Sequence, residues 1–250
     1  MQRMLWPLAT GLVVLAVWSA AVRLSGTAIF PSPVKVLLAL RGLWRAGVLG
    51  TDLEVSLCRV LLGFGGGVLL GVPLGALVAR SRRAAIAINP LLQLFRPISP
   101  IAWIPLSIIF FGISNLSCVF LTFLAAFFPV VMSTRESVRN VPAIYLRAAE
   151  NFGLSRPAMF FRVLIPAALP GILAGLRIAL GVSWLVLVAA EMIAVSSGLG
   201  YLIIDARNAG QRTDLVVAAM LLIGTVGLLM DLAMRRVETL RAVRWGFRAE

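Results

Sequence analysis

Few residue types in this chain could carry out bond chemistry. The sequence has no histidine, two cysteines (Cys58 and Cys118) and one lysine, Lys35. Zinc-protease and cysteine–histidine chemistry need ligands and bases that this set lacks. Lys35 lies between two valines and not in the glycine-rich loop with which an ATPase holds phosphates. The sequence therefore predicts no catalytic residue and no metal site.

Charged and aromatic residues inside apolar segments are the stronger candidates: Arg96, Arg177, Glu191, Trp103 and Trp184. A charge at membrane depth costs roughly 2.5–3.5 kcal/mol on insertion scales unless it meets water or a partner. The two arginines could line a pathway for an anion, because an oxyanion favours guanidinium donors. Alternatively, the two arginines determine the orientation of the chain in the membrane, or they pack against neighbouring helices. The acid could relay protons or sodium ions, or it could pair with an arginine inside the bundle. The two tryptophans could line the pathway or simply pack.

The composition indicates an all-α integral membrane protein. Apolar residues make up 60% of the chain, charged residues only 13%, and the mean hydropathy is +0.99. At about twenty residues per spanning helix, the chain has room for about six spans and almost no soluble domain. The net charge of +13 could suggest nucleic acid, but the basic residues fall between apolar segments, so we expect no nucleic-acid binding.

The expected spans cover residues 5–22, 56–79, 84–112, 116–132, 171–195 and 215–234. Between the first two, apolar and basic residues alternate after Pro31 and Pro33, which predicts an amphipathic helix on the membrane surface. The third span is broken by prolines and contains Arg96, which favours a segment that lines a pathway. The prolines could instead only bend this helix, with Arg96 reaching the inner interface.

Gly63, Gly67, Gly71 and Gly75 follow one another at intervals of four residues in the second span. This spacing places them on one face of a helix. Small residues let two helix backbones approach closely in a membrane, where helices have no hydrophobic reason to associate. We interpret this face as a helix-packing surface.

Basic residues predict the orientation of the chain. Fourteen arginines fall at position 3 and in the ranges 80–83, 135–162 and 235–248, whereas the opposite loops hold six basic residues. Positive residues accumulate on the cytoplasmic side of membrane proteins. The sequence therefore predicts that both termini and the segment 133–170 are cytoplasmic.

Within that segment lies an ordered-looking polar stretch, Arg147–Pro166, with the sequence RAAENFGLSRPAMFFRVLIP. It resembles the EAA loop of ABC importer permeases, whose pattern is Glu-Ala-Ala, three residues, Gly, nine residues, Ile, one residue and Leu-Pro. Ala148, Ala149, Gly153 and Pro166 keep this spacing, and Arg147 stands where the pattern has Glu. Glu150 follows the two alanines. We expect two short helices, residues 144–152 and 157–163, that dock into an ATPase.

Further stretches resemble the nitrate, taurine, alkanesulfonate and bicarbonate branch of these permeases. They are FRPISPIAWIP (95–105), FGI (111–113), IPAALP (165–170), GLRIALG (175–181), VAAEM (188–192), SGLGY (197–201) and TD (213–214). The resemblance implies a type I ABC importer permease in a bacterial inner membrane. It also implies a second permease copy, ATPase subunits that bind ATP and Mg²⁺ in place of this chain, and a periplasmic or lipid-anchored solute-binding protein.

The expected organisation has three parts. Residues 1–50 contain an N-terminal span and a periplasmic amphipathic segment, residues 51–236 form the transmembrane core with the coupling loop 133–170, and residues 237–250 form a basic tail. The expected substrate is a small anion, most similar to a sulfonate or taurine, with nitrate or bicarbonate as alternatives. Two other hypotheses stay open: a gradient-driven carrier or channel that uses Glu191, and a membrane scaffold without transport.

Overall fold

The computed structural model describes residues 2–25, 30–210 and 212–238, which contain helices and no strands. The helices are α1 (Gln2–Ser25), α2 (Pro33–Arg45), α3 (Val48–Arg80), α4 (Arg82–Phe95), α5 (Ile104–Phe111), α6 (Asn115–Arg139), α7 (Ala143–Asn151), α8 (Arg156–Met159), α9 (Ile165–Ala194), α10 (Leu199–Asn208) and α11 (Thr213–Glu238). A 3₁₀ turn, Pro100–Trp103, precedes α5, and a π-helical turn, Phe160–Leu164, joins α8 to α9.

The apolar helices agree with the predicted all-α membrane fold of about six spans. Among the described residues, four helices are long and apolar enough to cross a membrane: α3, α6, the continuous helix Arg156–Ala194, and α11. The pair α4 and α5 makes a fifth span if it is counted as one helix bent by 83°. The first helix adds a shorter apolar stretch, Ala9–Leu24.

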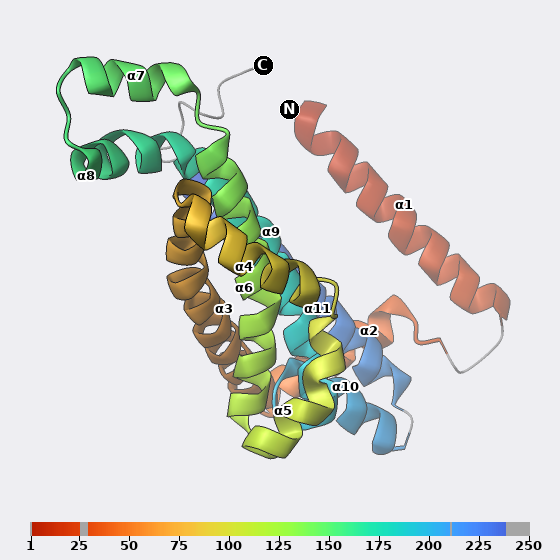
Figure 1. The fold of residues 1–250 in the computed structure, drawn as a ribbon. Helices are drawn as coiled ribbons and strands as arrows, with labels where there is room; N and C mark the ends of the chain where they lie inside the picture. The colour runs from red at the N-terminus through yellow and green to blue at the C-terminus, as the bar shows by residue number, and fades with distance from the viewer. Residues whose placement is uncertain (1, 26–29, 211, 239–250) are drawn as a thin grey trace.

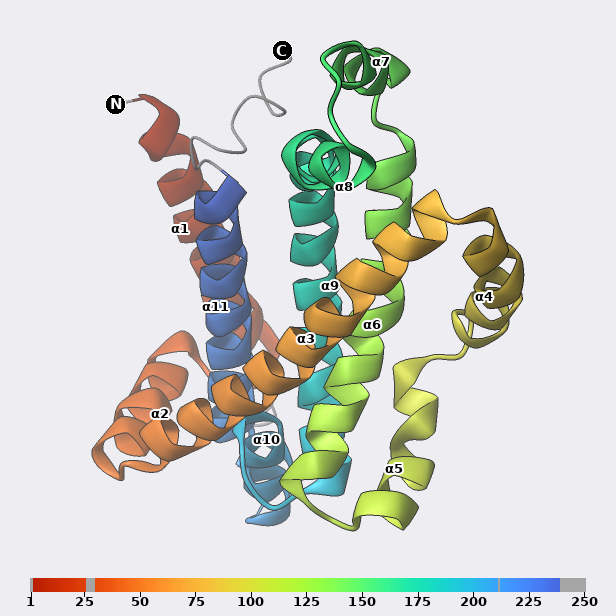
Figure 2. The same cartoon turned by 60° about the vertical axis from the view of Figure 1, so that its left-hand side comes forward.

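Helices α3, α6 and α9 pack together as the centre of the bundle (Figure 2). The predicted glycine face of α3 is buried and lies against α6. A Cβ atom on Gly67 would lie 2.6 Å from the Cβ of Ala126, so only glycine allows this approach. On α9, Gly171 and Gly175 face Ser137 and Ser133 of α6 in the same way. Small residues thus bring α6 close to a helix on each side.

Several helix boundaries differ from those expected. Helix α3 begins at Val48, eight residues earlier than predicted, because its charged first turns lie beyond the apolar stretch that marked the span. Helix α6 continues to Arg139, and Pro142 limits it. Residues 133–139 therefore belong to a helix and not to a loop. In the third span, Pro90 lies inside α4 without ending it, and the chain breaks only after Arg96.

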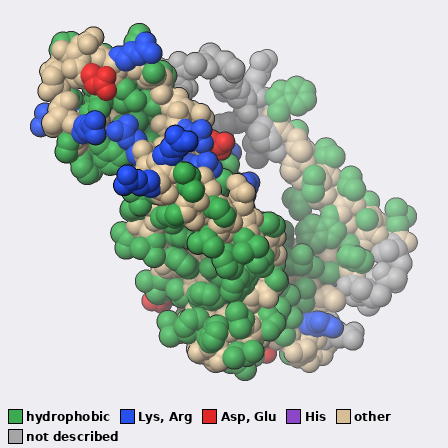
Figure 3. Space-filling view, viewed as in Figure 1, with side chains coloured by type: hydrophobic (Ala, Val, Ile, Leu, Met, Phe, Trp, Pro, Cys, Tyr) green, Lys and Arg blue, Asp and Glu red, His purple; other side chains and the backbone are tan. Residues whose placement is uncertain are grey.

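The bundle has two distinct ends. Helices α7 and α8 lie at one end, together with the start of α1 and the end of α11 (Figures 1 and 2). Helices α2 and α10 lie at the opposite end, with the junction of α5 and α6. Basic side chains gather toward the α7–α8 end (Figure 3), where residues 80, 82, 83, 139 and 147 are exposed arginines. The predicted basic tail lies almost entirely outside the described residues, since these end at 238.

Candidate functional site

The polar stretch Arg147–Pro166, predicted to dock with a partner, lies in a projection from the bundle that begins with α7 and ends at Pro166 (Figure 1). Its first arm is α7, which follows Pro142 and ends just before Gly153, whose φ is 70°. The Gly153 N–H donates to the Glu150 carbonyl, and the Leu154 N–H donates to the Ala149 carbonyl. This is the usual helix ending in which a left-handed glycine closes the last turn. Gly153 therefore makes the sharp bend between the two arms.

The second arm differs from the separate short helix that we expected. Helix α8 passes through the π turn directly into α9, so residues Arg156–Ala194 form one continuous helix of 39 residues. The Ile165 N–H donates to the Phe160 carbonyl, five residues earlier. Pro166 follows and has no N–H to donate, so the change in hydrogen-bond pattern accommodates a proline within the helix.

The outer surface of the projection combines apolar and basic groups. Arg147, Ala148, Glu150, Gly153 and Pro166 are exposed, whereas Ala149 is buried beneath them. A hollow of about 510 Å³ runs between the two arms, and its lining is Tyr145, Ala148, Ala149, Phe152, Leu154, Arg162, Val163, Pro166 and Ala167. Phe152 is 83% exposed. An exposed apolar surface with charged neighbours is typical of a site that binds another protein.

Arg96 lies at the break between α4 and α5, at the C-terminal cap of α4. Its side chain is exposed. No hydrogen bond or ion pair to its guanidinium is found within the described ranges. In Figure 2 this break lies between the two ends of the bundle, on the side away from α11. The aromatic ring of Trp103 packs near Phe95, with ring centroids 6.2 Å apart.

Arg177 is paired, unlike Arg96. Its guanidinium bonds to the carboxylate of Asp231 on α11, with Nη2 3.2 Å from Oδ2, and lies 3.6 Å from a Glu238 oxygen. Asp231 also accepts from Arg235. These groups join α9 to the end of α11 that lies near the projection. The Arg177 side chain is 30% exposed, so it lies at the edge of the bundle and not in its centre.

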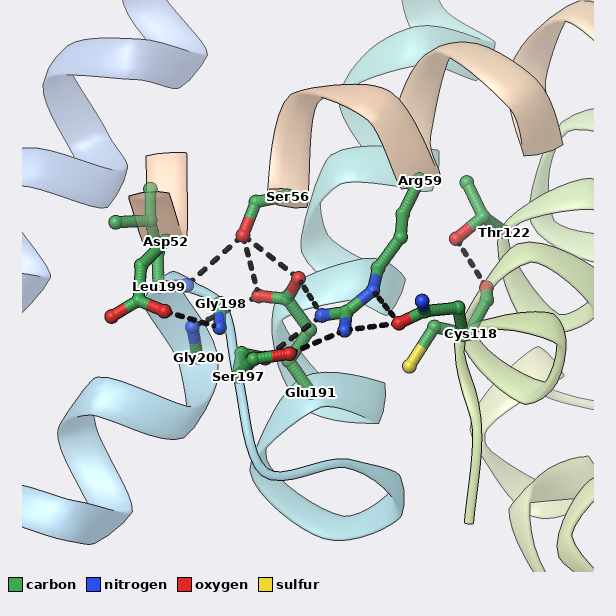
Figure 4. A network of polar contacts seen from close by, with 11 residues as sticks. Asp52, Ser56, Arg59, Cys118, Thr122, Glu191, Ser197, Gly198, Leu199 and Gly200 are labelled. Atoms are coloured by element: carbon green, nitrogen blue, oxygen red, sulfur yellow. Dashed lines mark hydrogen bonds and ion pairs between the residues drawn. The ribbon is translucent and has the colours of Figure 1, made fainter. Parts of the chain in front are cut away.

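Glu191 is completely buried and forms an ion pair with Arg59 of α3, at 2.8 Å. Its two oxygens also accept from the Ser56 hydroxyl, at 2.8 and 2.9 Å (Figure 4). Trp184, about two turns earlier on the same helix, donates its indole N–H to the Ile223 carbonyl of α11 and is 5% exposed. Both side chains are thus held within the protein interior by contacts to neighbouring helices.

The fold and these contacts can be compared with known proteins. Residues 68–242 match the family described as the inner membrane component of binding-protein-dependent transport systems. The chain belongs to this family. The match covers well over half of the sequence and includes the projection, α9 and α11.

Named relatives of this permease include three curated proteins. The taurine transport system permease protein TauC of Escherichia coli K12 is 36% identical over 93% of this chain and 90% of that protein. The putative aliphatic sulfonates transport permease protein SsuC of Bacillus subtilis is 36% identical over 93% and 84%. The nitrate import permease protein NrtB of a Synechocystis strain is 35% identical over 91% and 86%.

The fold of the permease resembles a solved structure of the MetNI methionine ABC transporter in an inward-facing conformation. The TM-score is 0.65 at 18% sequence identity, and the match covers 83% of this chain and 97% of that one. The similarity supports the type I importer fold that the sequence predicted.

Sequence reasoning missed the residues that surround Glu191. In the sequence, Ser56 only begins the expected span 56–79 and Arg59 only lies within it, and nothing links either residue to Glu191. Residues 59 and 191 are 132 positions apart, so no local pattern could pair them. The one available signal was that a buried acid in a membrane protein needs a basic or hydrogen-bonding partner.

Proposed function

We propose that this permease forms the pathway through which an ATP-driven importer carries a small anion across the inner membrane. A sulfonate or taurine-like anion is the favoured substrate, with nitrate and bicarbonate as alternatives. The names of the relatives support this class, since they concern taurine, aliphatic sulfonates and nitrate. The energy would come from separate ATPase subunits, which would bind ATP and Mg²⁺ and contact the projection formed by Arg147–Pro166.

The continuous helix Arg156–Ala194 is the observation that best supports coupling. A force on α8 acts on α9 without an intervening flexible loop, because the two helices join through the π turn. Helix α7 connects through residues 140–142 to α6, another of the three central helices. Movement of the projection would therefore move α6 and α9 as rigid elements, which is one way that small displacements at one site open or close another.

Arg96 is the best candidate for contact with the anion. A cation between the two ends of a membrane bundle is costly if it faces lipid, so its exposed side should face water or a second permease copy. Arg177 is less suited to this role because carboxylates already occupy its guanidinium. Trp103 lies near the same break and could border the pathway, whereas Trp184 is enclosed by α11.

The contacts of Glu191 disfavour the gradient-driven carrier. A proton or sodium relay needs access to water at some stage of the cycle. Glu191 has no exposed surface and is bonded to Arg59, Ser56 and a backbone N–H. A scaffold without transport gains no support from any contact of the described residues.

The full importer would contain two permeases, two ATPase subunits and a solute-binding protein on the outside. Both termini of the permease and the projection would face the cytoplasm. This orientation fits the gathering of basic side chains at the projection end and the location of α2 at the other.

Purification from the native membrane in mild detergent, followed by mass spectrometry, tests this proposal. We expect a stoichiometric ATPase subunit, and a solute-binding protein that can then be tested with taurine, an aliphatic sulfonate, nitrate and bicarbonate. Recovery of the permease alone, under conditions that preserve a known importer complex, would count against coupling. Binding of a cation or a neutral solute by the co-purified binding protein would count against the anion pathway.

A further inference from the structure

The start of α10 is fastened to other helices by side chains. Three successive N–H groups, of Gly198, Leu199 and Gly200, each donate to a different side chain (Figure 4). The acceptors are Asp52 at 2.9 Å, Ser56 at 2.9 Å and Glu191 at 3.0 Å, respectively. The first N–H groups of a helix have no partner within the helix and attract negative groups. In this protein, side chains of α3 and α9 accept the hydrogen bonds of these N–H groups.

Arg59 ties this arrangement to a third helix. Its Nη1 donates to Glu191 and to the Ser197 carbonyl, both at 2.8 Å, and its Nε lies 3.0 Å from the Asn115 side-chain oxygen of α6. Its Nη2 donates to the Ser197 hydroxyl at 2.7 Å. The side chain is 3% exposed. One planar guanidinium thus holds α3, α6, α9 and the turn before α10 in fixed relative positions.

The two glycines of the turn allow this close contact. Gly198 has a φ of 103°, and a Cβ there would overlap the Glu191 carboxylate and lie 2.8 Å from Nη1 of Arg59. A Cβ on Gly200 would overlap the Val188 carbonyl and lie 2.8 Å from the Glu191 Cβ. The Ser-Gly-Leu-Gly segment is therefore shaped to fit against this carboxylate.

A buried ion pair is weak evidence for a stabilising role, because replacing it with apolar side chains of similar size often leaves stability unchanged or raises it. The contacts through which Arg59 of α3 joins α6, α9 and the turn before α10 favour a role in fixing their arrangement. Helix α10 has only ten residues, too few for a stable helix in isolation. It carries the exposed charges Asp205 and Arg207 at the end opposite the projection. The side chains of α3 and α9 hold its first turn, while Leu202 and Ala206 further along it are buried in the bundle.

We propose that Arg59 and Glu191 are positioning residues for transport, which fasten α10 to α3, α6 and α9 so that this end of each permease moves as one body. This inference rests on the proposed function, in which force enters at the projection. Force on α6 and α9 would then reach α10 and α3 together, through the guanidinium and the carboxylate. The end of the bundle far from the ATPase would open and close as a unit.

Distance measurements between spin labels test the inference in the permease purified with its ATPase. The labels are placed at Glu54→Cys on α3 and Asp205→Cys on α10, both exposed, in a chain with Cys58→Ser and Cys118→Ala. With labels on one of the two permease copies only, we expect one narrow distance distribution that is the same without nucleotide and with a non-hydrolysable ATP analogue. In Glu191→Gln and Arg59→Met we expect a distribution at least about twice as broad. A nucleotide-dependent shift in the otherwise unchanged chain, or a narrow distribution in both variants, would overturn the inference.

The double variant Arg59→Met/Glu191→Met separates positioning from stability. Removal of both charges leaves no unpaired buried ion, so we expect the protein to express and to keep its ATPase subunit. The distance distribution should nevertheless remain broad, and stimulation of ATP hydrolysis by the solute-binding protein should be lost. A narrow distribution with full stimulation would show that the pair is only structural. Failure of the ATPase to co-purify with the unchanged chain would instead contradict the proposed function, and the distances without nucleotide would still report on α10.

Discussion

The two arginines that the sequence singled out as pathway candidates have different surroundings. Arg177 is bonded to the Asp231 carboxylate and lies near Glu238, so its charge is already balanced. Arg96 is exposed at the α4–α5 break, and the described residues offer it no acidic partner. A guanidinium with free donors can bind an oxyanion through two parallel hydrogen bonds. We therefore propose Arg96, and not Arg177, for contact with the anion.

We predict that Arg96→Gln lowers anion uptake far more than Arg177→Gln does. A hydrogen bond to a charged group contributes about 1.5–3 kcal/mol, so loss of the Arg96 contact should lower uptake by about ten- to a hundredfold. The measurement is uptake of labelled taurine, with nitrate as a second substrate, into proteoliposomes that contain the whole importer. Both variants should still bind the ATPase. Equal uptake by Arg96→Gln and the unchanged permease would remove Arg96 from the pathway.

At this scale the sequence indicates which residues are unusual but not which residues they contact. Glu191 and Arg96 stand out because charged groups are rare inside apolar segments. Glu191 is paired with Arg59, a residue more than a hundred positions away in the sequence. Arg96 has no ionic partner among the described residues, which no local pattern could show. Asn115 likewise falls between the expected spans 84–112 and 116–132 and has no special mark in the sequence, whereas its side-chain oxygen accepts from Arg59.

At the scale of the helices, the glycine face of α3 offers a test of packing. We predict that Gly67→Ala destabilises the permease, because its Cβ would meet Ala126 at 2.6 Å and force α3 and α6 apart. Such overpacking costs about 1–3 kcal/mol. The matched control is Gly65→Ala in the same helix, where a Cβ would meet nothing within 4 Å. Thermal unfolding in detergent should show a lower midpoint for the first variant and an equal or higher midpoint for the second.

The bend at Gly153 offers a test of coupling. We predict that Gly153→Ala reduces ATPase binding and transport, because the left-handed backbone at φ 70° strains a residue with a Cβ by about 1–2 kcal/mol and would reorient the two arms of the projection. The control is Gly47→Ala at the opposite end of the bundle, which has φ 72° and equally open space around its Cβ. Both variants should reach the membrane in similar amounts.

Co-purification of the ATPase and uptake by reconstituted importer are the measurements for this pair. The backbone strain is matched, so only the location of the glycine differs. Equal transport by both variants would argue against a coupling role for the projection.

The sequence shows patterns within a helix, but it does not show that one helix continues into the next, as α8 does into α9. The four-residue glycine spacing predicted the buried face of α3, since periodicity is a local property. The two arms around Gly153 were also indicated by a glycine between two helix-forming stretches. The π turn was missed, because Pro166 reads locally as the end of a segment and only the hydrogen bond from Ile165 to Phe160 shows that the helix continues.

At the scale of the whole molecule, the main feature is that the two ends of the bundle are built from different helices. The projection, the start of α1 and the end of α11 share one end, and α2 and α10 share the other. The arginine distribution in the sequence predicts such a division, because basic residues that set topology accumulate on one side of the membrane. Which helices pack in the centre was not predictable in this way, since apolar composition is nearly uniform among the spans.

Accessibility of introduced cysteines tests the orientation of this arrangement. We predict that Arg41→Cys on α2 reacts with a membrane-impermeant maleimide added to intact spheroplasts, and that Phe152→Cys on the projection reacts only after the membrane is opened. Both positions are exposed, so burial does not explain a difference between them. The background chain carries Cys58→Ser and Cys118→Ala and should not react. The reverse pattern would contradict the orientation that the arginines predict.

The same Phe152→Cys variant connects orientation to coupling. Phe152 is 83% exposed and borders the hollow between the two arms of the projection, so an ATPase that binds there should cover it. We expect labelling of opened membranes to be several-fold slower when the ATPase is present than after it has been stripped away, whereas labelling of Arg41→Cys should be unaffected. Because Arg41 lies at the other end of the bundle, a slowing at both positions would indicate a general loss of access. A slowing at residue 152 alone would locate the partner on the projection, on the side of the membrane where ATP is found.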